Sequence, residues 1–392
     1  MLKVDCLIVG GGMVGAATAL SLAELGLKVA VVEVKPPSPF DEEQQSQAVF
    51  DLRVSAISLA SEQLLSQLNA WQQITNWRSC AYKRLGVWED DIAYAEFNAD
   101  EIGQPHLGHI VENRLIQLSL WQQLQSNANV TLLCPEQLVS FTQDESQVLV
   151  ELSSQTLTTK ILIGADGANS KVRQLAGIGI TGWDYQQSAM LINVTTEVGQ
   201  QDITWQKFAA GGPLAFLPMP GNNASLVWYQ QKAEIKRLAQ LSNRQLQEEV
   251  HQHFPKRLGK VEVVNKGAFP LTRRHANDYV KGRVVLVGDS AHTINPLAGQ
   301  GVNLGFKDVA ALQTVIAKAI GSGENYHGEQ VLKRYEKARR MDNLIMMTGM
   351  DAIYTTFANP STPVRFLRNI GIFAAHRAPI LKNKALAYAC GI

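Results

Sequence analysis

Apolar residues along the chain follow distinct patterns, and each predicts a kind of element. Short apolar runs typical of buried strands occupy 7–9, 29–32, 161–163 and 284–287. Apolar spacing and composition predict helices over 16–25, 58–68, 113–125, 243–254 and 304–319. Further strands are predicted at 130–133 and, as pairs, within 82–97 and 147–163. This mixture of strands and helices predicts an α/β protein.

The pattern changes between residues 190 and 269. Strands predicted at 224–229 and 261–264 flank a single helical stretch in this part of the chain. We therefore expect a β-rich domain, inserted into the α/β fold.

The first thirty-three residues have the order strand, glycine-rich turn, helix, strand and acidic residue. The turn keeps the G-x-G-x-x-G spacing and consists of Gly10, Gly11, Gly12, Met13, Val14 and Gly15. In a dinucleotide-binding unit the first glycine permits the tight turn, the second admits a pyrophosphate, and the third brings helix and strand together. The helix N-terminus favours phosphate, and Glu33 at the end of the second strand is placed to accept ribose hydroxyls. The pattern predicts an adenine dinucleotide, without distinguishing FAD from NAD.

Two later motifs also follow predicted strands. Asp166-Gly167 comes directly after the strand at 161–163, and Gly288-Asp289 follows the strand at 284–287. Open α/β sheets bind ligands at the carboxyl ends of their strands, where both aspartates would lie. Both motifs are also compatible with ordinary turns or helix caps.

Composition excludes several classes of function. The chain has 392 residues, which favours two domains, and its formal net charge of +1 gives no electrostatic basis for binding nucleic acid. The four cysteines are scattered without a C-x-x-C pair, so we expect no zinc, iron–sulfur or other metal site. The same pattern suits a protein of the reducing cytoplasm. Glycines interrupt the uncharged run at 6–23, so it is interpreted as part of the nucleotide-binding unit and not as a signal or membrane segment.

The three motifs, in this order, resemble those of the group A flavoprotein monooxygenases, the para-hydroxybenzoate hydroxylase-like class, over nearly the whole chain. The phrases at 53–57, 269–275 and 291–301 are similar to the ring hydroxylases of ubiquinone biosynthesis. This resemblance implies a Rossmann-like (GR2-type) FAD-binding domain, an inserted β-rich substrate domain and a helical C-terminal tail. The expected ranges are 1–75, 98–182 and 270–345 for the FAD domain, 76–97 and 183–269 for the substrate domain, and 346–392 for the tail.

The resemblance also implies roles for individual residues. Glu33 would bind the adenosine ribose, Arg53 would lie beside the pyrophosphate or flavin, and Asp289 would contact the ribityl and pyrophosphate region. Gly301, Val302 and Asn303 would face the isoalloxazine, and Asp166 would serve either FAD or NAD(P)H. Many family members have an arginine where this chain has Asn113, with Arg114 one place later, so the usual contact at that position is in question.

The chemistry implied is hydroxylation of a prenylated benzoquinol or phenol with NAD(P)H and O₂, through a C4a-hydroperoxyflavin. Such a reaction requires no catalytic triad; His275 and His292 are weak candidates for a base. Two alternatives remain open at this stage. One is a sister hydroxylase acting at another ring position or on a different phenol, or a dehydrogenase. The other is a non-catalytic protein of the FAD fold that binds a prenylated molecule.

The tail has a composition that suits a membrane surface. Within 344–392, Met, Phe, Ile and Leu residues alternate with basic ones, and no acidic residue follows Asp351. The basic residues are Arg365, Arg368, Arg377, Lys382 and Lys384. We therefore expect a cytoplasmic protein that associates through this segment with the inner membrane or with a biosynthetic assembly, although the same pattern also suits helices packed on the FAD domain.

Overall fold

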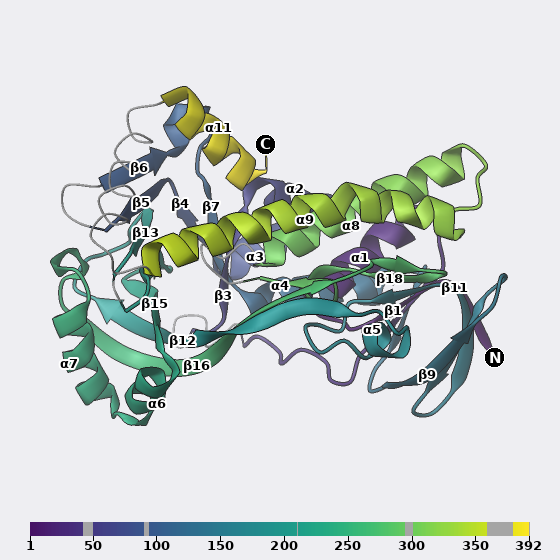
Figure 1. Ribbon diagram of the computed structural model, residues 1–392, viewed down its shortest axis with the longest axis horizontal. Helices are drawn as coiled ribbons and strands as arrows, with labels where there is room; N and C mark the ends of the chain where they lie inside the picture. Colours follow the sequence, from purple (N-terminus) through teal and green to yellow (C-terminus); the bar gives the residue numbers. More distant parts are fainter. Residues whose placement is uncertain (42–49, 90–93, 210, 295–300, 359–378, 392) are drawn as a thin grey trace.

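The computed structural model describes residues 1–41, 50–89, 94–209, 211–294, 301–358 and 379–391. The described chain forms two large sheets and one small one. Figure 1 shows the two large sheets towards opposite ends of the molecule, with the long helix α9 (Glu329–Ala358) lying along both.

The first large sheet contains the predicted nucleotide-binding strands. Its order is β17 (Val280–Lys281), β18 (Val284–Leu286), β11 (Thr156–Gly164), β1 (Leu2–Val9), β2 (Val29–Val32) and β8 (Val130–Leu133), and β11 also pairs with the hairpin of β10 (Val148–Leu152) and β9 (Leu138–Gln143). Strands β1, β2, β11 and β18 run parallel, so their carboxyl ends share one edge. All three sequence motifs follow these strands and therefore meet at that edge.

Helices cover this sheet and explain the apolar runs within its parallel strands. Helices α1 (Met13–Ala23), α4 (Asn113–Ser126), α8 (Gly301–Gly321) and α9 contribute to one core with β1, β2, β11 and β18. A parallel sheet that is covered in this way needs apolar residues throughout its strands instead of alternating ones. The predicted strands and helices of this region are therefore present in the expected order.

The second large sheet is antiparallel except where β13 and β5 pair in parallel. Its order is β19 (His292–Thr293), β16 (Val261–Ala276), β12 (Ile180–Thr196), β15 (Asn223–Gln231), β14 (Leu214–Pro218), β13 (Ile203–Lys207), β5 (Arg84–Trp88) and β6 (Tyr94–Asn98). Helices α6 (Lys232–Gln240) and α7 (Asn243–His253) pack on it through a core that includes Trp205, Phe216 and Trp228. Side chains alternate along a strand, so other residues of the same strands point away from this core.

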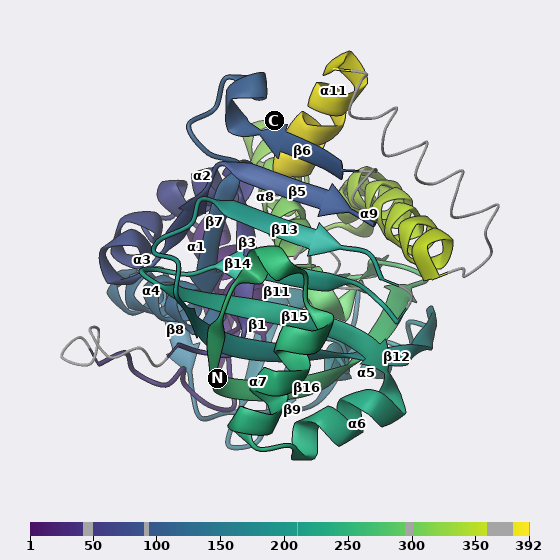
Figure 2. The ribbon, with the colours of Figure 1, turned by 90° about the vertical axis from the view of Figure 1, so that its left-hand side faces the viewer.

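The remaining described elements form a small sheet and several further helices and turns. A small sheet consists of β3 (Val54–Ser58), β7 (Gly108–Glu112) and β4 (Cys80–Tyr82). The other helices are α2 (Leu59–Gln67), α3 (Trp71–Trp77), α5 (Lys171–Leu175) and α11 (Pro379–Cys390), with 3-10 turns at Ala99–Ile102, Lys256–Leu258 and Gly288–Ser290. Figure 2 shows α11 beside β6, where its Leu386 and Cys390 are buried in a cluster with Leu107 and Ala99.

The expected domain boundaries remain predictions, but several elements cross them. Strand β16 begins at the predicted 261–264 strand and continues for 16 residues to Ala276, beyond the expected boundary at 269. Helix α9 runs through the expected boundary at 345. Within the described ranges, no helix combines the length and the apolar character needed to cross a bilayer.

Candidate functional site

A cavity of about 880 Å³ lies where the three motifs meet. Its lining includes Gly12, Met13 and Val14 from the turn after β1, Ala165 and Gly167 from the turn after β11, and Val287 and Asp289 after β18. Arg53, Asn113, Gly301 and Val302 line the same space. Segments nearly 300 positions apart in the chain are thus brought together as the sequence predicts.

The glycine turn separates into structural and ligand-facing positions. Gly10 has φ +105°, and a Cβ there would lie 2.5 Å from the carbonyl oxygen of Ala165. A Cβ on Gly15 would lie 1.9 Å from the carbonyl oxygen of Gly10. By contrast, a Cβ on Gly12 would meet no protein atom within 4 Å, and no side chain caps the helix that begins after it. The open space at Gly12 and the uncapped helix N-terminus suit the pyrophosphate of FAD.

Glu33 lies beside this turn and does not line the cavity in the structure. Its carboxylate accepts hydrogen bonds from the backbone N–H of Gly11 at 2.6 Å and of Val34 at 2.8 Å. The carboxylate therefore fixes the turn. A carboxylate has acceptor capacity for about four hydrogen bonds, so Glu33 retains capacity for ribose hydroxyls.

Asp289 faces the cavity from a 3-10 turn that starts at Gly288. Gly288 has φ +60°, and a Cβ there would lie 3.1 Å from the side chain of Val14, so this turn packs directly on the start of α1. The Asp289 side chain is accessible through the cavity. Burial by the surrounding protein nevertheless raises its pKa, a shift that His292 and Arg53 oppose.

Asn113, and not Arg114, faces the cavity. Its side chain accepts a hydrogen bond from the Ser55 hydroxyl at 2.7 Å, and its backbone N–H donates to the carbonyl of Arg53. Arg114 instead binds Asp51 at 2.7 Å. The position at which the resemblance suggests an arginine is therefore filled here by a neutral amide.

Two other predicted cofactor residues have structural contacts. One carboxylate oxygen of Asp166 accepts the N–H groups of Lys171 and Val172 at the start of α5, while the other is buried without a hydrogen-bond partner among the described residues. The side chain of Asn303 bonds Ser58, Ser61 and the carbonyl of Ala56 at 2.8–3.0 Å. Asn303 thus ties α8 to the β3–α2 junction, and its neighbours Gly301 and Val302 line the cavity instead.

The two histidine candidates lie in a buried polar network beneath the Asp289 turn. His292 contacts Asp308 at 2.5 Å, and His275 contacts the Tyr279 hydroxyl at 3.1 Å. Burial, together with nearby positive groups, lowers the pKa of His275 to about 4. Neither histidine is among the residues that line the cavity, so the structure gives both of them structural contacts. Residues 295–300 of the late motif lie outside the described residues.

The far part of the cavity is apolar, and sequence motifs did not identify it. It is lined by strand residues and by two C-terminal helices, including Val87, Phe97, Ala215, Val227, Met350 and Leu386. The strand predicted at 224–229 was a usable signal, because every second residue of β15 points away from the α6–α7 core. The contribution of α11 had no such signal, because it depends on contacts between residues far apart in sequence.

Comparison with known proteins identifies similar sequences over nearly the whole chain. A family model described as "FAD binding domain" matches residues 3–343. The 3-demethoxyubiquinol 3-hydroxylase of Escherichia coli (strain K12) is 49% identical over 98% of each chain. The mitochondrial ubiquinone biosynthesis monooxygenase COQ6 of Rattus norvegicus is 32% identical, over 98% of this chain and 90% of that protein.

Solved structures show the same fold at lower identity. The p-nitrophenol 4-monooxygenase PnpA from Pseudomonas putida DLL-E4 superposes with a TM-score of 0.78 and 20% identity, covering 98% of this chain and 97% of that one. PqsL from Pseudomonas aeruginosa, a probable FAD-dependent monooxygenase, gives a TM-score of 0.79 and 20% identity over 95% of this chain and all of that one.

Proposed function

We propose, from the premise that this chain belongs to the FAD-dependent monooxygenases that include the ubiquinone-biosynthesis hydroxylases, that it hydroxylates the ring of a polyprenylated benzoquinol. The observation that supports this most strongly is one cavity that joins the dinucleotide-binding turns to an apolar chamber. FAD, when bound, supplies the redox chemistry by accepting a hydride from NAD(P)H and activating O₂. The protein provides binding, orientation and exclusion of water.

The residues that would hold FAD are those at the parallel strand ends. Gly12 and the start of α1 would receive the pyrophosphate, Glu33 the adenosine ribose, and Asp289 the ribityl region. Arg53 would contact the pyrophosphate or the flavin, and Gly301 and Val302 would lie against the isoalloxazine. Asp166 has one buried oxygen without a hydrogen-bond partner in the described part of the chain, and it would serve either FAD or NAD(P)H.

The chamber beyond these residues would orient the substrate. Its apolar walls exclude water and suit a ring that carries a prenyl chain. No protein base is assigned, because His275 and His292 bond other buried groups and an electron-rich quinol is already activated by its own hydroxyl groups. The sequence shows no second dinucleotide fingerprint, which fits NAD(P)H as a transient co-substrate.

Ring position is the finer part of the proposal. The sequence phrases resemble a 2-polyprenyl-3-methyl-6-methoxy-1,4-benzoquinol hydroxylase. The name of the E. coli relative gives hydroxylation at position 3 of demethoxyubiquinol. A benzoquinol that already carries prenyl, methyl and methoxy groups has one unsubstituted ring carbon, next to the methoxy carbon. We propose hydroxylation at that carbon.

Complementation tests this assignment. An E. coli strain without its 3-demethoxyubiquinol 3-hydroxylase should regain ubiquinone when it expresses this chain, and lipid extracts should lose the demethoxy precursor. A sister specificity would leave the precursor in place while the purified protein is yellow and bleached by NAD(P)H. A non-catalytic prenyl-binding protein would bind FAD without NAD(P)H-dependent bleaching.

Access to a prenylated substrate motivates a membrane contact near the C-terminus. On α9, Met341 and Ile345 are about 60% exposed and lie one helical turn apart. Lys382 does not contribute a free charge, because its ammonium binds Glu101 at 2.7 Å and its side chain is buried. Lys384 is exposed, and Arg365, Arg368 and Arg377 lie outside the described residues.

Liposome co-sedimentation distinguishes membrane binding from simple packing. If the tail binds anionic lipid, changing Arg365, Arg368 and Arg377 to Glu should reduce sedimentation with anionic vesicles and leave flavin content unchanged. Changing both exposed apolar residues of α9, Met341 and Ile345, to Ser should also reduce sedimentation with the vesicles. Equal sedimentation of all forms would show that the segment only packs on the protein.

A further inference from the structure

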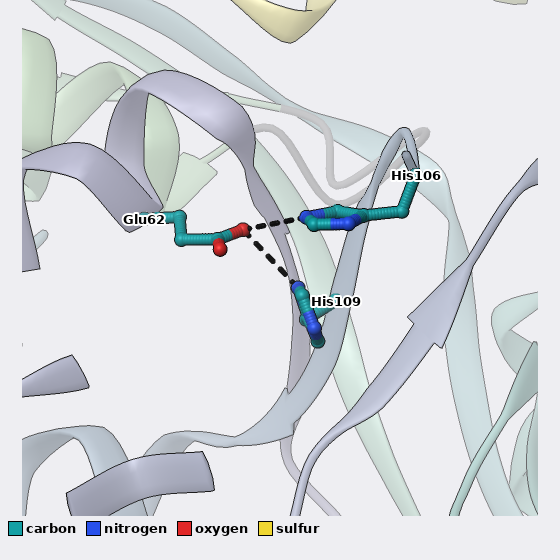
Figure 3. A group of neighbouring side chains, drawn as sticks. All are labelled: Glu62, His106 and His109. Carbon is teal, nitrogen blue, oxygen red and sulfur yellow. Dashed lines mark hydrogen bonds and ion pairs between the residues drawn. The ribbon is translucent and has the colours of Figure 1, made fainter. Parts of the chain in front are cut away.

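A cluster of two histidines and a glutamate lies outside the residues that line the cavity. Glu62 projects from α2, His109 from β7, and His106 from the residues just before β7 (Figure 3). The Glu62 Oε2 atom lies 2.9 Å from His106 Nε2 and 3.2 Å from His109 Nδ1. The three potential ligand atoms all lie within 4.8 Å of one another.

One carboxylate oxygen faces both imidazole rings. Glu62 Oε2 makes a hydrogen bond with His106 Nε2 and lies at ion-pair distance from His109 Nδ1. Two ring nitrogens therefore converge on a single carboxylate oxygen. The two imidazole rings meet edge to face, with centroids 4.4 Å apart, and the ring of Trp71 lies edge-on against His109.

The donor set matches a transition-metal site. Two imidazole nitrogens and one carboxylate suit Zn²⁺ and related ions, whereas Mg²⁺ and Ca²⁺ prefer oxygen ligands. Zn–N and Zn–O distances are about 2.0–2.2 Å, so two tetrahedral ligands lie roughly 3.3–3.5 Å apart. The separations between Glu62 and the two histidines are within a few tenths of an ångström of that value.

We propose that Glu62, His106 and His109 bind a divalent transition-metal ion of the Zn²⁺ type. The side chains of the triad retain 12–20% exposure, so water has access to complete the coordination. The sequence did not predict this site, because Glu62 lies 44 residues before His106 and 47 before His109, and only folding brings α2 onto β7.

At this location the metal would link α2 to β7 at the wall of the cavity. Ser58, which caps α2, pairs with Gly108 of β7, and both Ser58 and Leu107 line the cavity. An ion held by Glu62, His106 and His109 would fasten α2 to β7 next to these residues. The expected consequence is a metal-dependent gain in stability of the FAD-loaded protein, without a role for the ion in the redox reaction.

Metal content of the FAD-loaded, untagged full chain tests the proposal. After treatment with EDTA and dialysis, the protein should take up about one Zn²⁺ and no Mg²⁺, and Zn²⁺ should raise its unfolding temperature. Each of Glu62→Gln, His106→Gln and His109→Gln should weaken Zn²⁺ binding at least about tenfold. His253→Gln is the matched control, because His253 is half-exposed and lies 3.6 Å from Glu249 without a third ligand.

Three results would overturn the proposal. The first is that the wild-type protein takes up no Zn²⁺, or that all three variants take it up as well as the wild type does. The second is a change of unfolding temperature in the variants that is the same with and without Zn²⁺, which is expected of a hydrogen-bonded triad. The third is the absence of an anomalous difference peak between the three side chains in Zn²⁺-soaked wild-type crystals, whereas such a peak would support the proposal without relying on the folding of any variant.

Discussion

At the Gly12 end of the cavity the lining comes largely from turns that follow parallel strands, whereas at the Met350 end it comes from strand faces and helices. The turns depend on particular residue types: Gly10 and Gly288 have positive φ, and Gly15 leaves no room for a Cβ. The apolar walls depend only on the size and hydrophobicity of their residues. The turns therefore tolerate few residue types, whereas the apolar walls tolerate changes that preserve size and hydrophobicity.

The largest expected effect on stability comes from breaking the buried polar network beneath the Asp289 turn. Asp308 is fully buried, pairs with His292 and with Arg339 at 2.8 Å, and accepts the N–H of Gly288. Asp308→Ala leaves Arg339 buried without this partner and should lower the free energy of unfolding by about 3–5 kcal/mol, measured by chemical denaturation. Glu324→Ala, which removes an exposed partner of Arg334, should change stability little. Equal effects would contradict the role of burial.

The same carboxylate should make stability depend on pH. Burial by itself would raise the pKa of Asp308, but the contacts with His292 and Arg339 outweigh it and lower the pKa. The stabilisation is therefore present above the unfolded-state pKa of about 3.9 and is lost as pH falls towards the lower folded value. Asp308→Ala should lose this acid-range dependence.

Two glycines of one turn should separate folding from cofactor binding. Gly15→Ala forces a Cβ against the Gly10 carbonyl and should destabilise the apoprotein by about 1–3 kcal/mol or more. Gly12→Ala meets no protein atom, so the apoprotein should keep its stability while FAD binding weakens markedly. Thermal unfolding of the apoproteins and FAD titration distinguish the two. Unchanged FAD affinity in Gly12→Ala would show that the pyrophosphate lies elsewhere.

The contrast between local turns and long-range packing also explains what the sequence could predict. The order of β1, α1 and β2 was predictable because spacing and residue type are both local. Strand β16 was predicted only in part, and α6 was not predicted, because their extents depend on packing in the second sheet. Asn303 was expected to face the flavin, but its side chain bonds Ser58 and Ser61, which lie more than 240 residues away in the sequence.

Glu33 should show a mixed effect, because it holds Gly11 and is also the predicted ribose ligand. Glu33→Ala should weaken FAD binding by roughly 1–3 kcal/mol, the cost of leaving polar partners without an acceptor. Fluorescence titration with FAD measures this change, and Glu24→Ala on the outside of the same unit is the control. Wild-type affinity in Glu33→Ala would remove Glu33 from the site.

Replacing Asp289 should have a smaller effect on folding, and the replacement should stabilise the apoprotein. Enclosure by the surrounding protein raises the pKa of Asp289, so at neutral pH its negative charge costs stability, although solvent reaches the exposed side chain and keeps this cost small. The cost disappears as pH falls through the acidic range. Asp289→Asn should therefore raise the unfolding temperature of the apoprotein at neutral pH, with a difference that shrinks at acidic pH. The same change should reduce FAD affinity and the coupling of NAD(P)H oxidation to hydroxylation. A lower unfolding temperature at neutral pH would contradict this account.

Product labelling with ¹⁸O₂ tests most directly whether the two ends of the cavity act on one substrate. The FAD-loaded protein, supplied with NAD(P)H and a short-chain prenylated methoxy-methyl benzoquinol, should form a hydroxylated product that carries one labelled oxygen. Ala215→Phe places a ring in the apolar chamber and should abolish this product while flavin bleaching by NAD(P)H persists. NAD(P)H-dependent bleaching of the wild-type protein without labelled product, or full labelling in Ala215→Phe, would contradict the assignment of that chamber to the substrate.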